Sequence, residues 1–274
     1  MECFEVKKGV RMKYDISKSI RGSALSMVLP LFIMAEVHAS AEDVHHIIDI
    51  CTSSERILKD YALIGMKITY HDPKRDLEET VARLDKDMEE LEKHKLTKTL
   101  QDEEVGLQKE WLEIEENLTH DPVKASALTL HHHVNTFAKH CEVLAEHLAQ
   151  DTGNPAEHYV VLIARLNLNV QELAGVYTMK AWGAIGDDEY YKEVKDVLED
   201  YTKTYDELIA AKSNMVSESV KSKLKTLKKQ FMVFEYMAES KSGRYVPLLI
   251  AKKANKIHKS TIEILKQEEK EVEK

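Results

Sequence analysis

The feature that most limits the fold of this chain is the helical spacing of its apolar residues, which persists from Glu42 almost to the end. Between positions 130 and 148 the inward residues follow at steps of four and three: Leu130, Val134, Phe137, Cys141, Leu144 and Leu148. This alternation is typical of the buried positions of bundled helices. Only nine glycines and five prolines occur among 274 residues, against roughly 12% for the two together in average usage. Few turns can form, so we expect long helices and no sheet.

Turn residues divide the helical part of the chain into about eight segments. The richest cut is Asp151-Thr152-Gly153-Asn154-Pro155, which separates two halves with a similar order of segments. We therefore predict an all-α, up-and-down helical bundle made of two tandem four-helix repeats, residues 42–150 and 151–274. A single array of eight helices is the alternative.

The first 41 residues have the layout of a secretory signal peptide. A basic stretch precedes the uncharged apolar run Ser23–Ala35, and Ala39-Ser40-Ala41 offers a cleavage site after Ala41. Met12 is a possible true start, and a buried N-terminal helix is the alternative reading. The apolar run is shorter than the roughly 20 residues of a spanning helix. We predict a periplasmic product without membrane insertion after processing.

Net charge restricts the partners. The chain carries a formal charge of −9, and removal of the basic N-terminal segment makes the remaining protein more acidic. Like charges repel, so the sequence argues against nucleic acid as a partner.

Two cysteines, Cys51 and Cys141, occupy inward positions of the first and fourth predicted helices. In an up-and-down bundle these helices are antiparallel neighbours, and the two thiols then lie at a similar depth. An oxidising compartment would permit a disulfide. We predict a Cys51–Cys141 bond, and two buried thiols are the alternative.

Histidines suggest a second kind of site. His45 and His46 begin the first predicted helix, His147 ends the fourth, and His158 begins the fifth. An antiparallel arrangement could gather these four imidazoles at one end of the bundle, where they could bind a divalent transition metal. Otherwise they are solvated or packing residues, and no cofactor is needed.

The helix predicted around residues 160–181 holds the best small-ligand candidate. Arg165 and Asn169 lie on one border of its apolar face, and Asn167 and Gln171 lie on the other. An arginine with amide neighbours can bind a small anion through charge-assisted hydrogen bonds. The alternative is a purely structural role, in which these residues are the polar flanks of a buried face.

The same helix carries a family resemblance. Residues 164–174, ARLNLNVQELA, and the following AWG at 181–183 resemble the GRQRMLSQRMAK…AWGVDD box of the PilJ-type domain, found in type IV pilus chemotaxis transducers and related to nitrate/nitrite sensors. Residues 55–60, ERILKD, resemble a second copy. The resemblance implies helical sensing, with Arg165 and Arg56 contacting a small anion such as nitrate.

These patterns lead to a functional expectation. The chain lacks the Gly-x-Ser-x-Gly, phosphate-loop and His-Glu-x-x-His motifs of common enzymes. We expect a non-enzymatic, PilJ-like sensory or binding protein that recognises a small ligand, or a periplasmic or membrane signalling protein. A histidine-based metal- or haem-binding bundle and a structural module without ligand are the alternatives.

Overall fold

The computed structural model describes residues 38–69, 71–94, 96–240 and 242–272. The predicted signal peptide therefore lies outside the described residues, except for its last four positions. Within the described ranges the secondary structure is entirely helical, which confirms the all-α prediction. The helices are α1 (Ala41–Ser54), α2 (Arg56–Gly65), α3 (Pro73–Leu91), α4 (Lys98–Leu118), α5 (Lys124–Asp151), α6 (Glu157–Trp182), α7 (Asp187–Ala210), α8 (Glu218–Ala238) and α9 (Pro247–Val272).

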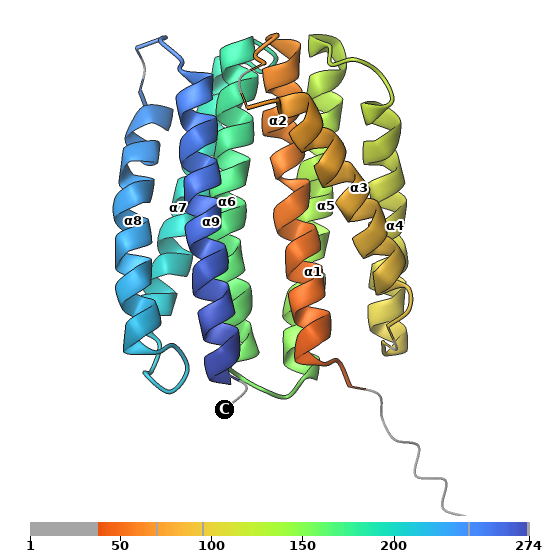
Figure 1. Ribbon diagram of the computed structural model, residues 1–274, viewed down its shortest axis with the longest axis vertical. Helices are drawn as coiled ribbons and strands as arrows, with labels where there is room; N and C mark the ends of the chain where they lie inside the picture. Colours follow the sequence, from red (N-terminus) through yellow and green to blue (C-terminus); the bar gives the residue numbers. More distant parts are fainter. Residues whose placement is uncertain (1–37, 70, 95, 241, 273–274) are drawn as a thin grey trace, which may run out of the picture. The chain divides into compact units, whose positions relative to one another are not determined.

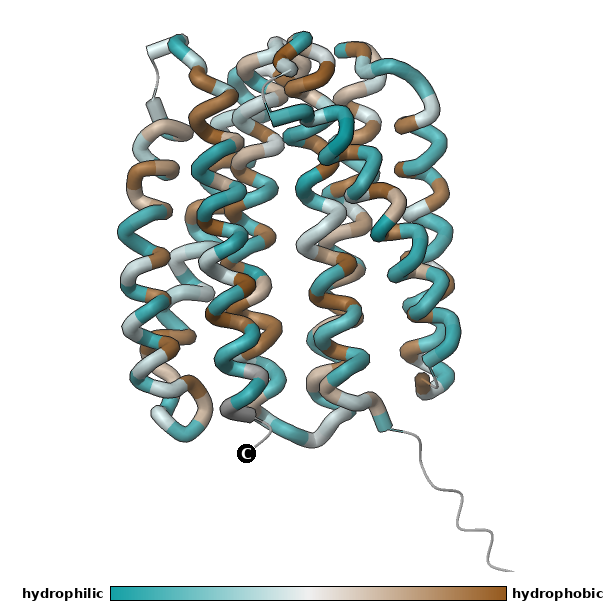
Figure 2. Tube along the Cα trace, viewed as in Figure 1, coloured by the Kyte–Doolittle hydropathy of each residue, from teal (hydrophilic) through white to brown (hydrophobic). Residues whose placement is uncertain are grey.

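The helices of this compact unit run side by side as long rods, and α3 crosses its neighbours obliquely (Figure 1). Apolar and hydrophilic residues alternate along each rod (Figure 2), as amphipathic helices require. The inward positions predicted between residues 130 and 148 are all buried in α5. Helical periodicity therefore identified the core-facing side of this element correctly.

Helices α1 and α2 form an almost continuous rod that is interrupted at Glu55. Just before the interruption, the Thr52 hydroxyl donates to the Asp49 carbonyl at 3.3 Å, and the Ser54 hydroxyl donates to the Cys51 carbonyl at 2.8 Å. Such side-chain bonds compete with the backbone ladder and bend helices. They account for an interruption that hydrophobic spacing did not predict.

The start of α1 coincides with the predicted cleavage site. Ser40 accepts a hydrogen bond from the Asp43 amide at 3.2 Å, and the Asp43 carboxylate accepts one from the Ser40 amide at 2.6 Å. The Ala39 amide donates to Asp151 at the end of α5, at 2.5 Å. Cleavage after Ala41 would remove this capping box, which stabilises the helix start.

Helix α6 is the central element of the bundle. It packs against α1, α2 and α5 from the first half of the chain, and against α7, α8 and α9 from the second. Most of its residues are buried on every side, which is the pattern of a helix enclosed by others. One hydrophobic cluster thus joins residues from both halves. The two predicted repeats share a core, and the turn between α5 and α6 is a connection within it.

Candidate functional site

The predicted ligand residues Arg165 and Asn169 lie in a cavity of about 390 Å³ beside α6. Helix α6 contributes one wall because Arg165, Asn169 and Glu172 are spaced by four and three residues and share a face. The other walls come from α5, α7 and the interruption between α1 and α2. The cavity is lined by Glu55, Asn135, Ala138, Lys139, Glu142, Arg165, Leu168, Asn169, Glu172, Lys192, Glu193, Asp196, Val197 and Asp200.

Carboxylates dominate this lining. Among the described residues, six acidic and three basic side chains contribute to it. The Arg165 Nε donates to Glu142 Oε1 at 3.0 Å, and its Nη2 lies 3.8 Å from Glu146 Oε1. The Asn169 amide donates to Asp200 Oδ2 at 2.9 Å. Both predicted ligand residues therefore already bind carboxylates, and an incoming anion would have to displace them.

Two glutamates in the cavity have raised pKa values. Burial raises the pKa of Glu55 well above its ordinary value, and the nearby carboxylates of Glu172, Glu142 and Glu193 raise it further. Burial, followed by Glu142 and Glu193, raises the pKa of Glu172 to about 7. Glu55 is only 2% exposed, and its Oε2 has no hydrogen-bond partner among the described residues. Such a group favours the neutral form or a neighbouring positive charge.

The other predicted ligand residues of α6 point to a different part of the molecule. Asn167 Nδ2 lies 2.9 Å from His258 Nδ1 on α9, and the Gln171 amide donates to the Ala254 carbonyl at 3.2 Å. The five predicted ligand residues therefore do not form one site.

Arg56 on α2 belongs with the group around His258. Burial first, and then the positive charges of Arg56, Lys59 and Arg83, lower the pKa of His258 to about 4. The Arg56 Nε is buried, with no hydrogen bond within the described residues. Arg56 and Asn167 thus both lie near His258, whereas Arg165 binds Glu142.

The four histidines predicted to bind metal are not brought together. His45 Nε2 lies 3.8 Å from Glu157 Oε2, and His46 Nε2 donates to the Asp87 carbonyl at 2.7 Å. His147 Nδ1 lies 2.9 Å from Glu103 Oε1. These neighbours come from three different helices, α6, α3 and α4, so each of these histidines has its own partner.

His158 gives the chemical reason against that metal site. Its Nδ1 lies 3.0 Å from Glu146 Oε2 and its Nε2 lies 3.1 Å from Glu207 Oε1. The hydrogen bond that His158 donates to Glu146, opposed by burial and reinforced by Glu207, raises the pKa of His158 to about 9. At neutral pH both ring nitrogens are therefore protonated, and neither has a lone pair for a metal ion.

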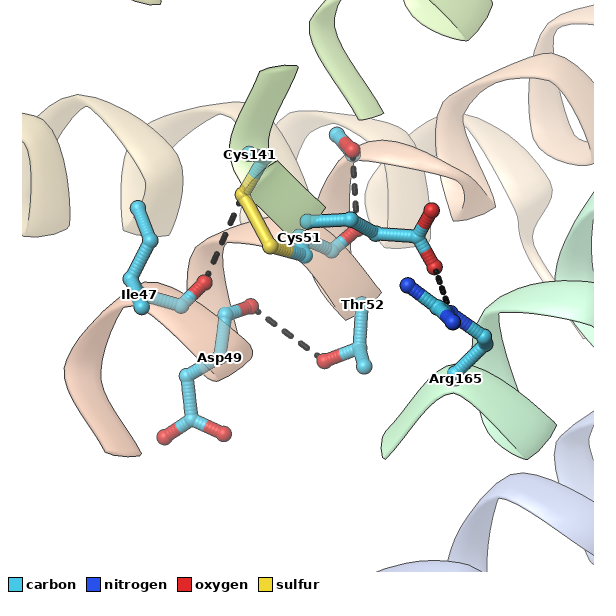
Figure 3. Close-up of a disulfide and its surroundings, with 8 residues drawn as sticks. Ile47, Asp49, Cys51, Thr52, Cys141 and Arg165 are labelled. Atoms are coloured by element: carbon cyan, nitrogen blue, oxygen red, sulfur yellow. Dashed lines mark hydrogen bonds and ion pairs between the residues drawn. A yellow bond between two sulfur atoms is a disulfide. The ribbon is translucent and has the colours of Figure 1, made fainter. Parts of the chain in front are cut away.

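The predicted cysteine pair is present beside the cavity. Cys51 on α1 and Cys141 on α5 are joined at disulfide distance, with their Cα atoms 5.6 Å apart, which confirms the predicted depth of both residues (Figure 3). Cys51 lies one helical turn before Glu55, and Cys141 directly precedes Glu142. The pair therefore connects two walls of the cavity.

Sequence reasoning missed most of the carboxylates of the cavity. The four on α7, Glu193, Asp196, Asp200 and the nearby Glu189, recur at steps of three and four residues. This spacing marks one helix face, and it was the available signal. The spacing does not show which helix packs against this face, because that depends on the tertiary structure.

Within the described part of the chain, no helix combines the length and the apolar character that a membrane span requires. Comparison with protein-family models, with curated proteins and with solved structures finds no match to this chain. The PilJ-type resemblance therefore stays a prediction from sequence.

Proposed function

We propose that this chain is a non-enzymatic binding protein that holds a small cation in the cavity between α5, α6 and α7. The observation that carries the proposal is Glu55, whose buried carboxylate faces other carboxylates and lacks a hydrogen-bond partner in the described residues. A buried acidic cluster is costly unless it is protonated or paired. A bound cation would supply the missing positive charge.

Arg165 and Asn169 receive a different role from the one that the sequence suggested. By binding Glu142 and Asp200, at 3.0 and 2.9 Å, they hold two carboxylates of the cavity wall in place. Arg165 also offsets part of the negative charge. We propose that both are positioning residues for the cation site.

The setting of this activity is proposed from the sequence. The three-part N-terminal pattern supports export to the periplasm, and an oxidised Cys51–Cys141 pair would agree with an oxidising compartment. The PilJ-type resemblance supports a sensory or binding role in partnership with a signalling protein. A mature N-terminus determined by mass spectrometry after expression in a bacterial host with a periplasm tests the export.

Calorimetric titration tests the cation site directly. We expect the full chain to bind putrescine or Zn²⁺ in the cavity and not to bind nitrate there. Because the pKa of Glu172 is about 7, cation binding at pH 7 should release protons. The measured heat should then vary with the ionisation enthalpy of the buffer.

Matched variants assign the binding to the cavity. The double change Glu55→Gln and Glu172→Gln should weaken cation binding at least tenfold and remove the proton release. Glu89→Gln, on the exposed face of α3, should leave both unchanged. Failure of both cations to bind, or binding that the double variant retains in full, would contradict the proposal.

A specific observation favours an anion site as the second candidate. Lys59 is buried, its Nζ donates to Asn255 Oδ1 at 2.7 Å, and burial lowers its pKa. Burial first, and then the positive charges of Arg56, Lys59 and Arg83, lower the pKa of His258 and favour its neutral imidazole. A small anion near Arg56 would offset this charge.

Nitrate titration separates the two arginines. If the second candidate is correct, Arg56→Gln should abolish nitrate binding and Arg165→Gln should preserve it. Loss of nitrate binding in Arg165→Gln would instead support the site expected from the sequence resemblance. The absence of any nitrate heat in the unaltered protein would eliminate the second candidate.

A further inference from the structure

A group of side chains beside the cavity combines an imidazole with carboxylates, and two of its members, Asn135 and Glu193, line the cavity. His131 and Asn135 lie on α5, and Glu189 and Glu193 lie on α7. Each pair is separated by four residues, so both members project from the same face of their helix. Residue pairs at this spacing can ligate one metal ion.

The donor atoms already converge. One ligand atom from each of His131, Glu189 and Glu193 lies within 4.8 Å of the other two, and His131 Nε2 is 3.1 Å from Glu193 Oε2. Metal bonds of about 2.0–2.2 Å place neighbouring ligand atoms roughly 3–4 Å apart. Small side-chain movements would therefore complete a three-ligand site.

Unsatisfied polar atoms provide a second and independent observation. His131 is 0% exposed. Its Nδ1 and the Asn135 Oδ1 are buried without a hydrogen-bond partner in the described residues, and the Glu193 Oε2 is buried with the His131 Nε2 beside it, at 3.1 Å. Buried polar groups normally find partners, and a cation beside the His131 Nε2 would provide one for the Asn135 and Glu193 oxygens.

The orientation of Asn135 points to the same missing component. Its Nδ2 lies 3.1 Å from His131 Nε2. The nitrogen and oxygen of a side-chain amide can be exchanged by a rotation of 180°. That rotation would bring the buried Oδ1 towards His131 Nε2, where it could serve as a fourth, oxygen ligand.

We infer that His131, Glu189 and Glu193 bind one divalent transition-metal ion, with Asn135 as an additional oxygen donor. Two carboxylates neutralise the charge of the ion, and Glu172 and Glu55 lie in the same cavity. One imidazole among oxygen ligands favours Zn²⁺, Mn²⁺ or Fe²⁺ over Mg²⁺ and Ca²⁺. This inference rests on the proposed function, since Glu193 and Asn135 also line the cation cavity.

The test uses the full chain after treatment with a chelator and its removal. Titration with Zn²⁺ should give one ion per chain, and Mg²⁺ should bind at least tenfold more weakly. Co²⁺ substitution should produce a visible absorption spectrum that reports nitrogen and oxygen ligands. Native mass spectrometry gives the stoichiometry independently.

Variants of α7 provide the matched comparison. Glu189→Gln should weaken Zn²⁺ binding at least tenfold, whereas Glu199→Gln, on an exposed position of the same helix, should leave it unchanged. His131→Gln should change the Co²⁺ spectrum. His131 is fully buried, so its substitution could prevent folding. Glu189 is half-buried, and Glu189→Gln therefore tests the metal site even if His131→Gln does not fold.

The outcomes separate this inference from the proposed function. If putrescine binds through Glu55 and Glu172 but Zn²⁺ does not bind, the cation cavity stands and the metal site is wrong. Zn²⁺ affinity that is unchanged in Glu189→Gln also overturns the metal site. If neither cation binds, both proposals fail.

Discussion

At the level of single residues, two glutamates of the cavity differ from glutamates at the surface in their affinity for protons. Glu55 and Glu172 have raised pKa values because burial disfavours the charged form and neighbouring carboxylates add repulsion. Glu89 on α3 and Glu199 on α7, in contrast, are exposed to solvent. The sequence letters are the same in both settings, so this difference depends on which residues meet.

Glu172 predicts that stability falls as pH rises. Its folded-state pKa of about 7 lies above the ordinary 4.5, so the folded chain binds more protons than the unfolded chain between these values. The free energy of unfolding should decrease from pH 4.5 to 7, by up to about 3 kcal/mol from this group. Urea titrations at several pH values, with chelator present, measure the decrease.

Replacing the ionisable group tests that assignment. Glu172→Gln should remove most of this pH dependence and raise the stability at pH 8, since no buried charge forms. Glu89→Gln should retain the slope of the unaltered protein. An unchanged slope in Glu172→Gln would show that another group causes it.

His158 predicts a second pH window. Its pKa is raised to about 9 by Glu146 and Glu207, so the ion pairs stabilise the folded chain fully below pH 6.5 and are lost as pH rises through 9. The side chain is 40% exposed, and solvent screening limits the effect to about 0.5–1 kcal/mol. His158→Gln should lower the free energy of unfolding at pH 6 but not at pH 10. A loss of equal size at both pH values would contradict the assignment.

At the level of elements, close helix packing depends on two glycines that contact neighbouring side chains. A Cβ atom on Gly65, at the end of α2, would lie 2.2 Å from the Trp182 ring of α6, and one on Gly175 would lie 3.0 Å from the Leu58 Cβ. Trp182 in turn packs edge-on against Tyr61, with ring centroids 6.1 Å apart. These contacts bring α2 and α6 close together.

The same substitution should have opposite effects at two positions. Gly65→Ala should lower the free energy of unfolding by about 1–3 kcal/mol, because the Trp182 ring must move. Gly106→Ala, in the exposed part of α4 with nothing within 4 Å of the new Cβ, should raise it by about 0.5–1 kcal/mol through helix propensity. Thermal and urea unfolding of both variants provide the comparison. Equal effects at the two sites would contradict the packing argument.

At the level of the whole molecule, the cysteine pair connects α1 to α5 across 90 residues of chain. Closing a loop of this length reduces the entropy of the unfolded chain, which in the loop-entropy model raises the free energy of unfolding by about 4–5 kcal/mol. The pair also ties the two walls that carry Glu55 and Glu142. It should therefore support both the fold and the cavity.

Removal of the pair tests this contribution. The double variant Cys51→Ala and Cys141→Ala should lose up to about 4–5 kcal/mol of unfolding free energy, and a reductant should destabilise only the unaltered protein. Mass spectrometry of alkylated protein should detect no free thiol at either position before reduction. Two freely alkylated cysteines in exported protein would contradict the disulfide.

Some features of particular residues could be predicted from the sequence, and others could not. The buried positions of α5 and the shared depth of Cys51 and Cys141 followed from a spacing that only helices produce. The partners of Arg165 did not follow, because Glu142 is 23 residues away on another helix. The partners of the four histidines did not follow for a related reason: the ends of antiparallel helices meet, but the sequence does not give the rotation of each helix about its own axis.

The amino-acid pattern alone determined that this chain forms long amphipathic helices, which residues face inward, and where the turns fall. These properties are local, since they depend on residues within one or two helical turns. The tertiary structure decided that α6 is enclosed by both halves of the chain, and that carboxylates of α5, α6 and α7 meet around Arg165. The sign of the charge in the cavity thus arises from long-range packing, because the field at any site is the sum over side chains that the sequence keeps far apart.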